Sequence, residues 1–272
     1  MQSNKNKKYI LFGTGDYYKR FRRWFDEKDV VAILDNDVNK QGCLLDGSPV
    51  VAPSSIADYV YDVVVILSFY VTEMKKQLVM LGVEEDRIFH FYDLHELIAN
   101  DDTEDVVARD SVTEKKGILL LSHDLTLGGP ALALYHAALV LVKNGYEVTF
   151  ASMLDGELRC RLEEASIPVV IDDRLQIRTM RELSWTSGYQ LIICNTINYH
   201  TFLMSRDVTI PVIWWLHDSA FFYEGIRASK LQSIDMHNLK LVSVGPVPAN
   251  AMRRFRPDAI IEDLIYGVSH DT

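Results

Sequence analysis

The stretch Gly117-Ile-Leu-Leu-Leu-Ser-His-Asp-Leu-Thr-Leu-Gly-Gly-Pro130 decides how the larger part of this 272-residue chain folds. Its apolar first half is typical of a buried strand, and Ala131 to Asn144 has the pattern of a helix. Between them, Gly128 and Gly129 let the backbone approach a ligand, and the start of the helix offers unpaired N–H groups. The stretch therefore predicts a strand, a glycine turn and a helix that bind a nucleotide or another phosphate-bearing group.

Strands and helices alternate on both sides of this stretch. Short runs rich in β-branched or aromatic residues predict strands at 9–12, 30–34, 62–67, 88–91, 118–121, 147–151, 168–171, 191–194, 212–216, 241–244 and 260–265. Because alternating strands and helices favour parallel sheets, we predict the α/β class, with two Rossmann-like domains in series. They occupy residues 1–95 and 117–272, joined by an acidic linker at 96–116.

Composition excludes several classes of protein. The chain has 38 acidic and 28 basic residues, a net charge of −10, so nucleic acid is not an expected partner. Its three cysteines form no CxxC pair, which argues against a disulfide framework or a zinc site. The apolar run 9–12 behind the basic start is too short for a signal peptide or a membrane span. We therefore expect a cytoplasmic protein.

A glycine motif marks the first domain. Gly13-Thr-Gly15 follows the first predicted strand, and Asp35 closes the second strand, where an acid can bind a ribose. Tyr18 stands where the third glycine of the dinucleotide fingerprint belongs, and its bulk argues against NAD. The alternative is that the two glycines only permit a tight turn.

This domain also resembles a known family. Residues 8–95 are similar to the small N-terminal domain of bacterial sugar acyltransferases, through the motifs Gly13-Thr-Gly15, Leu34-Asp-Asn-Asp37, Lys40-Gln-Gly42, Gly47-Ser-Pro-Val50 and Val63-Val-Val-Ile-Leu-Ser68. The resemblance implies a nucleotide-sugar pocket bordered by Gly13, Gly15, Asp35 and Ser68. No acyltransferase repeat follows these residues, so acyl transfer is not expected.

The second domain resembles the N-terminal, acceptor-side half of glycosyltransferase family 4. The motifs that carry this resemblance are Ser122-His-Asp-Leu-Thr-Leu-Gly-Gly-Pro130, Asn144-Gly-Tyr-Glu-Val148, Asp155-Gly-Glu-Leu158 and Trp214-Trp-Leu-His-Asp218. It implies one half of a GT-B fold, transfer of a sugar with retention from a nucleotide-sugar donor, and no metal or other cofactor. The acceptor it implies is a saccharide or a lipid-linked molecule of surface polysaccharide assembly.

The resemblance assigns roles to single residues. His217 matches the family's histidine beside the donor sugar and is the candidate catalytic residue, chiefly as a hydrogen-bonding group. Gly128 and Gly129 would bring amides to the donor phosphates, and Asn195 and Thr196 would bind acceptor hydroxyls at a strand end. The alternative reading makes each of them structural: glycines that relieve crowding, an asparagine that closes a turn and a buried core histidine.

The donor half of the family is not evident in these residues. Its pair of glutamates, seven residues apart, is matched only by Glu96 and Glu104 in the linker, and Tyr266-Gly-Val268 resembles the hinge where that half would begin. We therefore expect a front portion or a split subunit that is inactive without a donor-binding partner.

Two competing functions use other features. A non-catalytic module would sense a nucleotide or nucleotide-sugar at the first domain. A metal-dependent hydrolase would use the pairs His123-Asp124 and His217-Asp218, although we expect no metal site. The basic run Met252-Arg-Arg-Phe-Arg256 on a predicted helix suggests at most a peripheral contact with the inner face of the membrane, and an ordinary surface helix is the simpler explanation.

Overall fold

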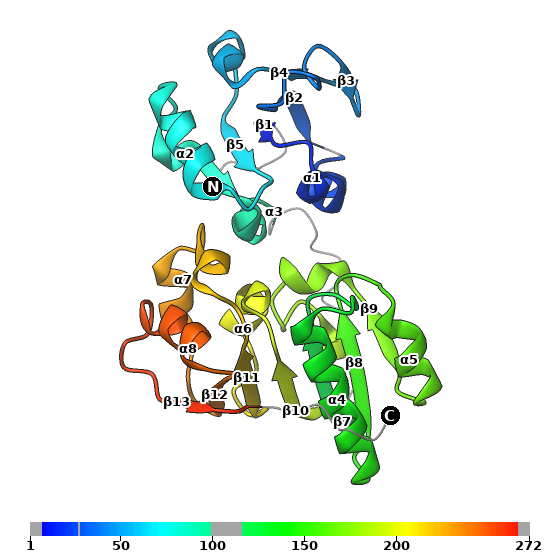
Figure 1. The fold of residues 1–272 in the computed structure, drawn as a ribbon. Coiled ribbons are helices and arrows are strands. Elements are labelled where there is room, and N and C mark those ends of the chain that lie inside the picture. Colours follow the sequence, from blue (N-terminus) through cyan, green and yellow to red (C-terminus); the bar gives the residue numbers. More distant parts are fainter. Residues whose placement is uncertain (1–6, 27, 99–115, 266–272) are drawn as a thin grey trace. The chain divides into compact units, whose positions relative to one another are not determined.

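The computed structural model describes residues 7–26, 28–98 and 116–265, and these fall into two compact units. Unit 1 comprises residues 1–103 and unit 2 residues 104–272, each built around its own sheet (Figure 1). The α/β class with mainly parallel sheets is confirmed. Most of the predicted linker, and the predicted hinge at Tyr266, lie outside the described residues.

Unit 1 has a six-stranded sheet in the order β3-β4-β2-β1-β5-β6. All neighbouring strands are parallel except β3 and β4. The elements are β1 (Lys8–Phe12), α1 (Asp16–Phe21), β2 (Asp29–Leu34), β3 (Leu44–Leu45), β4 (Ser48–Val51), β5 (Val63–Ile66), α2 (Val71–Met80), β6 (Ile88–His90) and α3 (Leu94–Ile98). Helix α2 buries Val71, Met74 and Leu78, which share one face, against Ile10 and other residues of the sheet.

The hairpin of β3 and β4 is not among the strands predicted from the sequence. Asp46 and Gly47 connect the two strands, both at positive φ angles (50° and 84°), which is typical of a tight hairpin turn. The strands are only two and four residues long, and Pro49 obscures the strand pattern because proline, which has no backbone N–H to donate, is rare inside strands.

Unit 2 has a seven-stranded sheet in the order β13-β12-β11-β10-β7-β8-β9, in which every pair of neighbours is parallel. The elements are β7 (Lys116–Ser122), α4 (Gly129–Lys143), β8 (Val148–Ser152), α5 (Leu158–Glu164), β9 (Val169–Ile171), β10 (Tyr189–Cys194), α6 (His200–Met204), β11 (Val212–Leu216), α7 (Ala228–Ser233), β12 (Leu239–Ser243), α8 (Pro246–Arg253) and β13 (Ile261–Asp263). All seven predicted strands are present.

The core of unit 2 explains the apolar run that precedes the glycine turn. Leu120 of β7 and Phe150 of β8 pack against Leu134 and Ala138 of α4, and all four are fully buried. Figure 1 shows α4 beside β7 and β8, and α8 lies along β12. Strand order reverses between β7 and β10, so this is the point where open α/β sheets bind their ligands.

Candidate functional site

Polar residues follow three neighbouring strands at the point of reversal in unit 2. His123 and Asp124 follow β7, Asn195 follows β10, and His217 and Asp218 follow β11. Parallel strands end at one edge of a sheet, so the structure brings these side chains to the same edge. The predicted residues Gly128, Gly129, Asn195 and His217 all lie at this edge or in the loops that extend from it.

Gly128 and Gly129 form the start of helix α4, as predicted. Gly128 is the N-cap residue, and Gly129 is the first residue of the helix and is exposed. The fully buried Asn195 reaches this turn from β10, and its Nδ2 donates a hydrogen bond of 2.7 Å to the carbonyl of Pro130. Its Oδ1 is buried without a hydrogen-bond partner among the described residues. Asn195 is therefore an oriented acceptor beside the helix start.

Thr196 lies next to Asn195, but its groups are used within the protein. Its hydroxyl accepts a hydrogen bond of 3.1 Å from the amide of Asn198 and caps the 3-10 helix Ile197–Tyr199. Its carbonyl accepts a bond of 3.0 Å from the indole of Trp214. Only 1% of the residue is exposed. The predicted contact of Thr196 with an acceptor stays a prediction.

The imidazole of His217 is partly buried at the end of β11, with its ring 4.8 Å from that of Trp215. Burial lowers the pKa of His217 to about 4, because the charged form loses its hydration. The ring is therefore neutral near pH 7. A neutral imidazole suits hydrogen bonding to a ligand better than donation of a proton.

The carboxylates of Asp124 and Asp218, which follow the two histidines in the sequence, also lie at this edge. Asp218 accepts a hydrogen bond of 2.7 Å from the amide of Ile197, and burial raises its pKa to about 6 against the effects of that bond and of His123. Asp124 lies 2.8 Å from Nε2 of His123. Across the part of the chain that the structure describes, no group of three or more His, Cys, Asp or Glu residues is arranged to hold a metal ion.

A third glycine, Gly156, fixes the shape of the edge. A Cβ at this position would lie 2.5 Å from both the carbonyl carbon and the oxygen of Leu125, so only glycine fits. The close approach lets the amide of Leu158 donate a bond of 2.9 Å to that same carbonyl. The motif Asp155-Gly-Glu-Leu158 thus holds the loop that leads to Gly128. No role of Gly156 was predicted from the sequence.

In unit 1 the glycine motif also lies at a point of strand reversal, between β1 and β5. Gly13 has a φ angle of 107°, which favours glycine, and its amide donates to the carbonyl of Leu34 at 2.8 Å. Gly15 is the N-cap of α1, and a Cβ there would meet nothing within 4 Å. Ser68 follows β5, and its hydroxyl accepts a bond of 3.2 Å from the amide of Tyr70.

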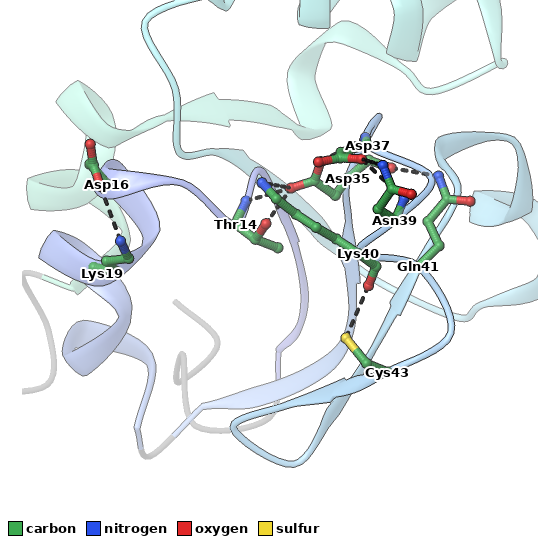
Figure 2. Close-up of polar contacts among 9 residues, drawn as sticks. All are labelled: Thr14, Asp16, Lys19, Asp35, Asp37, Asn39, Lys40, Gln41 and Cys43. Atoms are coloured by element: carbon green, nitrogen blue, oxygen red, sulfur yellow. Dashed lines mark hydrogen bonds and ion pairs between the residues drawn. The ribbon is translucent and has the colours of Figure 1, made fainter.

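Asp35 closes the glycine loop from within the protein (Figure 2). Its carboxylate accepts hydrogen bonds from the amide of Thr14 at 2.9 Å, from the Thr14 hydroxyl and from the amide of Asp37 at 2.8 Å. Lys40 lies 3.5 Å from the same carboxylate. Burial acts to raise the pKa of Asp35, but the hydrogen bonds and the charge of Lys40 lower it below its ordinary value. The predicted contact of Asp35 with a ribose stays a prediction.

Tyr18, at the position of the missing third glycine, is buried and donates a bond of 2.7 Å to Asp46 in the hairpin turn. It lines a small pocket with Arg22 and Asp46, and none of the four predicted nucleotide-binding residues lines that pocket.

The basic run Met252-Arg-Arg-Phe-Arg256 lies at the end of helix α8. Helix α8 ends at Arg253, before the end of the basic run, and the guanidinium of Arg256 bonds to the carbonyls of Leu231, Gln232 and Ile234 at 3.0 to 3.3 Å. At least one charge of the run therefore stabilises the end of α7. Of the helices in the described ranges, none is both long and apolar enough to cross a membrane.

Comparison with known proteins supports the reading of unit 2. Residues 114–244 match the family model of Glycosyl-transferase family 4, which confirms the resemblance predicted from the motifs. Residues 5–89 match the family model described as C2185-like, N-terminal, so the resemblance of unit 1 to sugar acyltransferases stays a prediction. None of the curated proteins matches the chain.

Among solved structures, the chain is similar to an alpha-glucosyltransferase in complex with UDP and a 13-mer DNA containing a HMU base. The two share 15% sequence identity, with a TM-score of 0.41. The match covers 54% of this chain and 42% of that chain, so this chain spans less than half the length of the protein it matches.

Proposed function

We propose that unit 2 is the acceptor-side half of a retaining GT-B glycosyltransferase. It transfers a sugar from a nucleotide-sugar to a saccharide or lipid-linked acceptor of surface polysaccharide assembly, on the cytoplasmic side of the membrane. The reaction needs a donor-binding domain in addition to residues 1–272. The family match over residues 114–244 supports the class of reaction.

The observation that carries this proposal is the buried amide oxygen of Asn195, which has no hydrogen-bond partner among the described residues. Burying an amide oxygen without a partner costs roughly 1–3 kcal/mol, and such groups are rare unless a ligand or water uses them. The Oδ1 atom of Asn195 is buried in this way, while its Nδ2 is fixed on the carbonyl of Pro130. An oriented amide oxygen is a good acceptor for the hydroxyl of a sugar.

The neighbouring groups fit the same reaction. In this proposal the first amides of α4, at Gly128 and Gly129, attract the charge that develops on the leaving diphosphate. The neutral ring of His217 supplies a hydrogen bond to the donor sugar without changing its charge. In this proposal no metal ion takes part, and the helix amides do the work of neutralising the diphosphate.

The test combines saccharide binding with sugar transfer. A panel of mono- and disaccharides is screened by saturation-transfer NMR against the wild-type chain and the variants Asn195→Ala and Gly245→Ala. Gly245→Ala is the control, because Gly245 lies at the same edge with no atom within 4 Å of an added Cβ. We expect at least one saccharide that binds the wild type and the control but not Asn195→Ala.

Calorimetry with nucleotide-sugars separates the competing function. The chain is a non-catalytic sensor if three results occur together. Nucleotide-sugars bind the wild type, Gly13→Val abolishes that binding, and no saccharide binds unit 2. Sugar transfer catalysed by residues 1–272 alone would show that no further donor-binding domain is needed.

A further inference from the structure

A polar cluster at the end of β9 lies at the carboxyl edge of unit 2, and the proposed function leaves it unused. Asp172 is the first residue after β9, and its amide donates a hydrogen bond of 2.9 Å to the carbonyl of Ser152, the last residue of β8. The cluster therefore extends the edge that holds Asn195, with β7 and β8 between β9 and β10. Because neighbouring strands are about 4.8 Å apart, the ends of β9 and β10 are separated by about 14 Å.

The carboxylate of Asp172 binds an arginine and a tryptophan together. Nε and Nη2 of Arg174 each donate a hydrogen bond of 2.9 Å, one to each oxygen, and the indole Nε1 of Trp185 donates another at 2.8 Å. Burial acts to raise the pKa of Asp172, but these bonds and the charge of Arg174 lower it below its ordinary value, so the carboxylate is ionised near pH 7. Its charge and that of Arg174 cancel, which makes the cluster polar without a net charge.

The two donors of this cluster reach the surface, while the carboxylate that joins them does not. The side chain of Arg174 is 38% exposed and Trp185 is partly buried, whereas the side chain of Asp172 is only 9% exposed. Because the indole N–H is bonded to Asp172, the rest of the ring can offer only an apolar surface. Sugars are recognised by these two kinds of group, since their C–H faces pack on aromatic rings and their hydroxyls bond to polar side chains.

The segment that begins with this cluster also touches the segment after Asn195. Residues Asp173–Gln176 form a 3-10 helix that packs against the 3-10 helix Ile197–Tyr199. Gln176 is 2% exposed, and neither Oε1 nor Nε2 of its amide has a hydrogen-bond partner among the described residues. A buried amide in this state is rare unless a water molecule or a ligand group bonds to it. The two polar places on the edge are thus joined by elements in contact, one of which holds unused hydrogen-bonding capacity.

We propose that Trp185 and Arg174 form a second saccharide-binding subsite, which takes a neutral sugar unit of the acceptor remote from the reacting hydroxyl, with Asp172 as the positioning residue. The inference rests on the proposed function, because Asn195 must hold the first sugar unit. A single sugar ring is too short to span the separation of the two strand ends, so the acceptor that fits this edge is an oligosaccharide. Gln176 bonds to the same acceptor, directly or through a bound water molecule.

The first measurement is NMR of the wild-type chain labelled with 15N-tryptophan. It is titrated with a monosaccharide whose binding depends on Asn195, and with neutral oligosaccharides that end in that monosaccharide. We expect the indole signal of Trp185, identified with Trp185→Phe, to shift with the trisaccharide and not with the monosaccharide. The indole of Trp24 in unit 1 is the control and should not shift. A Trp185 signal that ignores the trisaccharide, or responds equally to the monosaccharide, would overturn the inference.

The second measurement is the Kd of the same saccharides by calorimetry. The wild type should bind the trisaccharide about tenfold more tightly than the monosaccharide, and Trp185→Ala and Arg174→Gln should remove this gain without changing the Kd of the monosaccharide. Tyr146→Ala is the matched control and should keep the gain, because Tyr146 is 55% exposed in the loop before β8, at the opposite edge of the sheet.

The outcomes separate the subsite from the proposed function. If Trp185→Ala keeps the gain, or weakens the binding of every saccharide alike, the subsite is overturned and the proposed function stands. If no saccharide binds the wild type, both are overturned.

Gln176→Leu tests the buried amide separately. The substitution removes an amide that has no partner among the described residues and keeps a side chain of similar size, so the free energy of unfolding of unit 2 should not fall in urea denaturation. Its affinity for the trisaccharide should fall several-fold. A loss of stability with full affinity for the trisaccharide would overturn the contact of Gln176 with the acceptor.

Discussion

The carboxyl edges of the two sheets both lie at a point of strand reversal, but they differ in how many of their polar groups are hydrogen-bonded within the protein. In unit 1 the carboxylate of Asp35 is occupied by Thr14, Asp37 and Lys40, all within the protein. In unit 2 the Oδ1 of Asn195 and the hydroxyl of Ser122 are fully buried without partners among the described residues. One edge is closed by its own side chains, and the other is left with unused hydrogen-bonding capacity.

The surroundings of the two edges differ in the same way. In unit 1 the ring of Tyr17 in α1 lies 4.4 Å from that of Phe69 and 4.6 Å from that of Phe91, so aromatic side chains from the segments after β1, β5 and β6 pack together. In unit 2 the corresponding space holds His123, Asp218 and the turn at Gly128. The doubly wound sheet provides a place for a ligand, but the side chains decide whether it is used. Four predictions test this contrast.

The largest effect is expected at Gly156, on which the loop of the polar edge depends. In Gly156→Ala the new Cβ would lie 2.5 Å from the backbone of Leu125, so the two loops must separate. We expect a loss of about 3 kcal/mol in the free energy of unfolding of unit 2, measured by urea denaturation. Gly245→Ala, where nothing lies within 4 Å of the Cβ, should change it little. If Gly156→Ala destabilises unit 2 no more than Gly245→Ala does, the loop adapts to the added Cβ.

The next effect concerns the pH dependence of the polar edge. The pKa of His217 is lowered to about 4, so the unfolded chain binds a proton before the folded one, and stability is lost as the pH falls below 6.5. The pKa of Asp218 is raised to about 6, so the folded chain binds the proton first, and stability is gained as the pH falls below 6. The two contributions oppose each other between pH 6 and 4.

Single substitutions should separate these contributions. Relative to the wild type, His217→Asn should gain about 2 kcal/mol in the free energy of unfolding as the pH falls from 7 to 4, and Asp218→Asn should lose about as much. Urea denaturation at a series of pH values measures both. Parallel pH profiles for the wild type and both variants would mean that the edge is more hydrated than the structure indicates.

The sequence predicts the fold of unit 2 better than that of unit 1. The long apolar runs of β7 and β11 are unambiguous, because a strand buried on both faces has few polar residues. The hairpin at Leu44–Val51 is short, half exposed and contains Pro49, so no periodicity marks it.

The sequence predicts which residues lie at the carboxyl edge of the sheet, but not which of their polar groups are available to a ligand. Residues after strands of a parallel sheet must meet at one edge, and this rule places Asn195 and His217 correctly from the sequence. Which side chains remain available there depends on loop geometry. Thr196 caps a 3-10 helix, and Asp35 holds a glycine loop, through backbone amides that no spacing of residue types reveals. The close approach of Gly156 to Leu125 likewise depends on two loops that meet only in the fold.

The closed edge of unit 1 makes a third prediction. The pKa of Asp35 is lowered, so its carboxylate stabilises the folded chain above pH 4, and this contribution is lost as the pH falls through the lowered value. Asp35→Asn should lower the free energy of unfolding of unit 1 by about 1–2 kcal/mol at pH 7. Asp16→Asn is the control, since Asp16 is exposed and forms a surface ion pair with Lys19. If Asp35→Asn is as stable as the wild type, the hydrogen bonds of Asp35 within the protein contribute little, and its carboxylate can bind a ribose instead.

The smallest effect is expected at Tyr18, where unit 1 departs from the dinucleotide-binding fingerprint. Its hydroxyl donates to Asp46 at 2.7 Å, and Arg22 also holds that carboxylate at 2.7 Å. Tyr18→Phe should therefore cost only about 1 kcal/mol in the free energy of unfolding, because the partner left behind stays paired. Tyr18→Gly would empty a buried position and cost more, so the ring, and not the hydroxyl, is what this site requires. Nucleotide binding gained in Tyr18→Gly, measured by calorimetry with UDP-sugars, would show that unit 1 differs from a dinucleotide-binding domain by this one side chain. If Tyr18→Gly binds UDP-sugars no better than the wild type, Asp35 and the aromatic side chains close the edge independently of Tyr18.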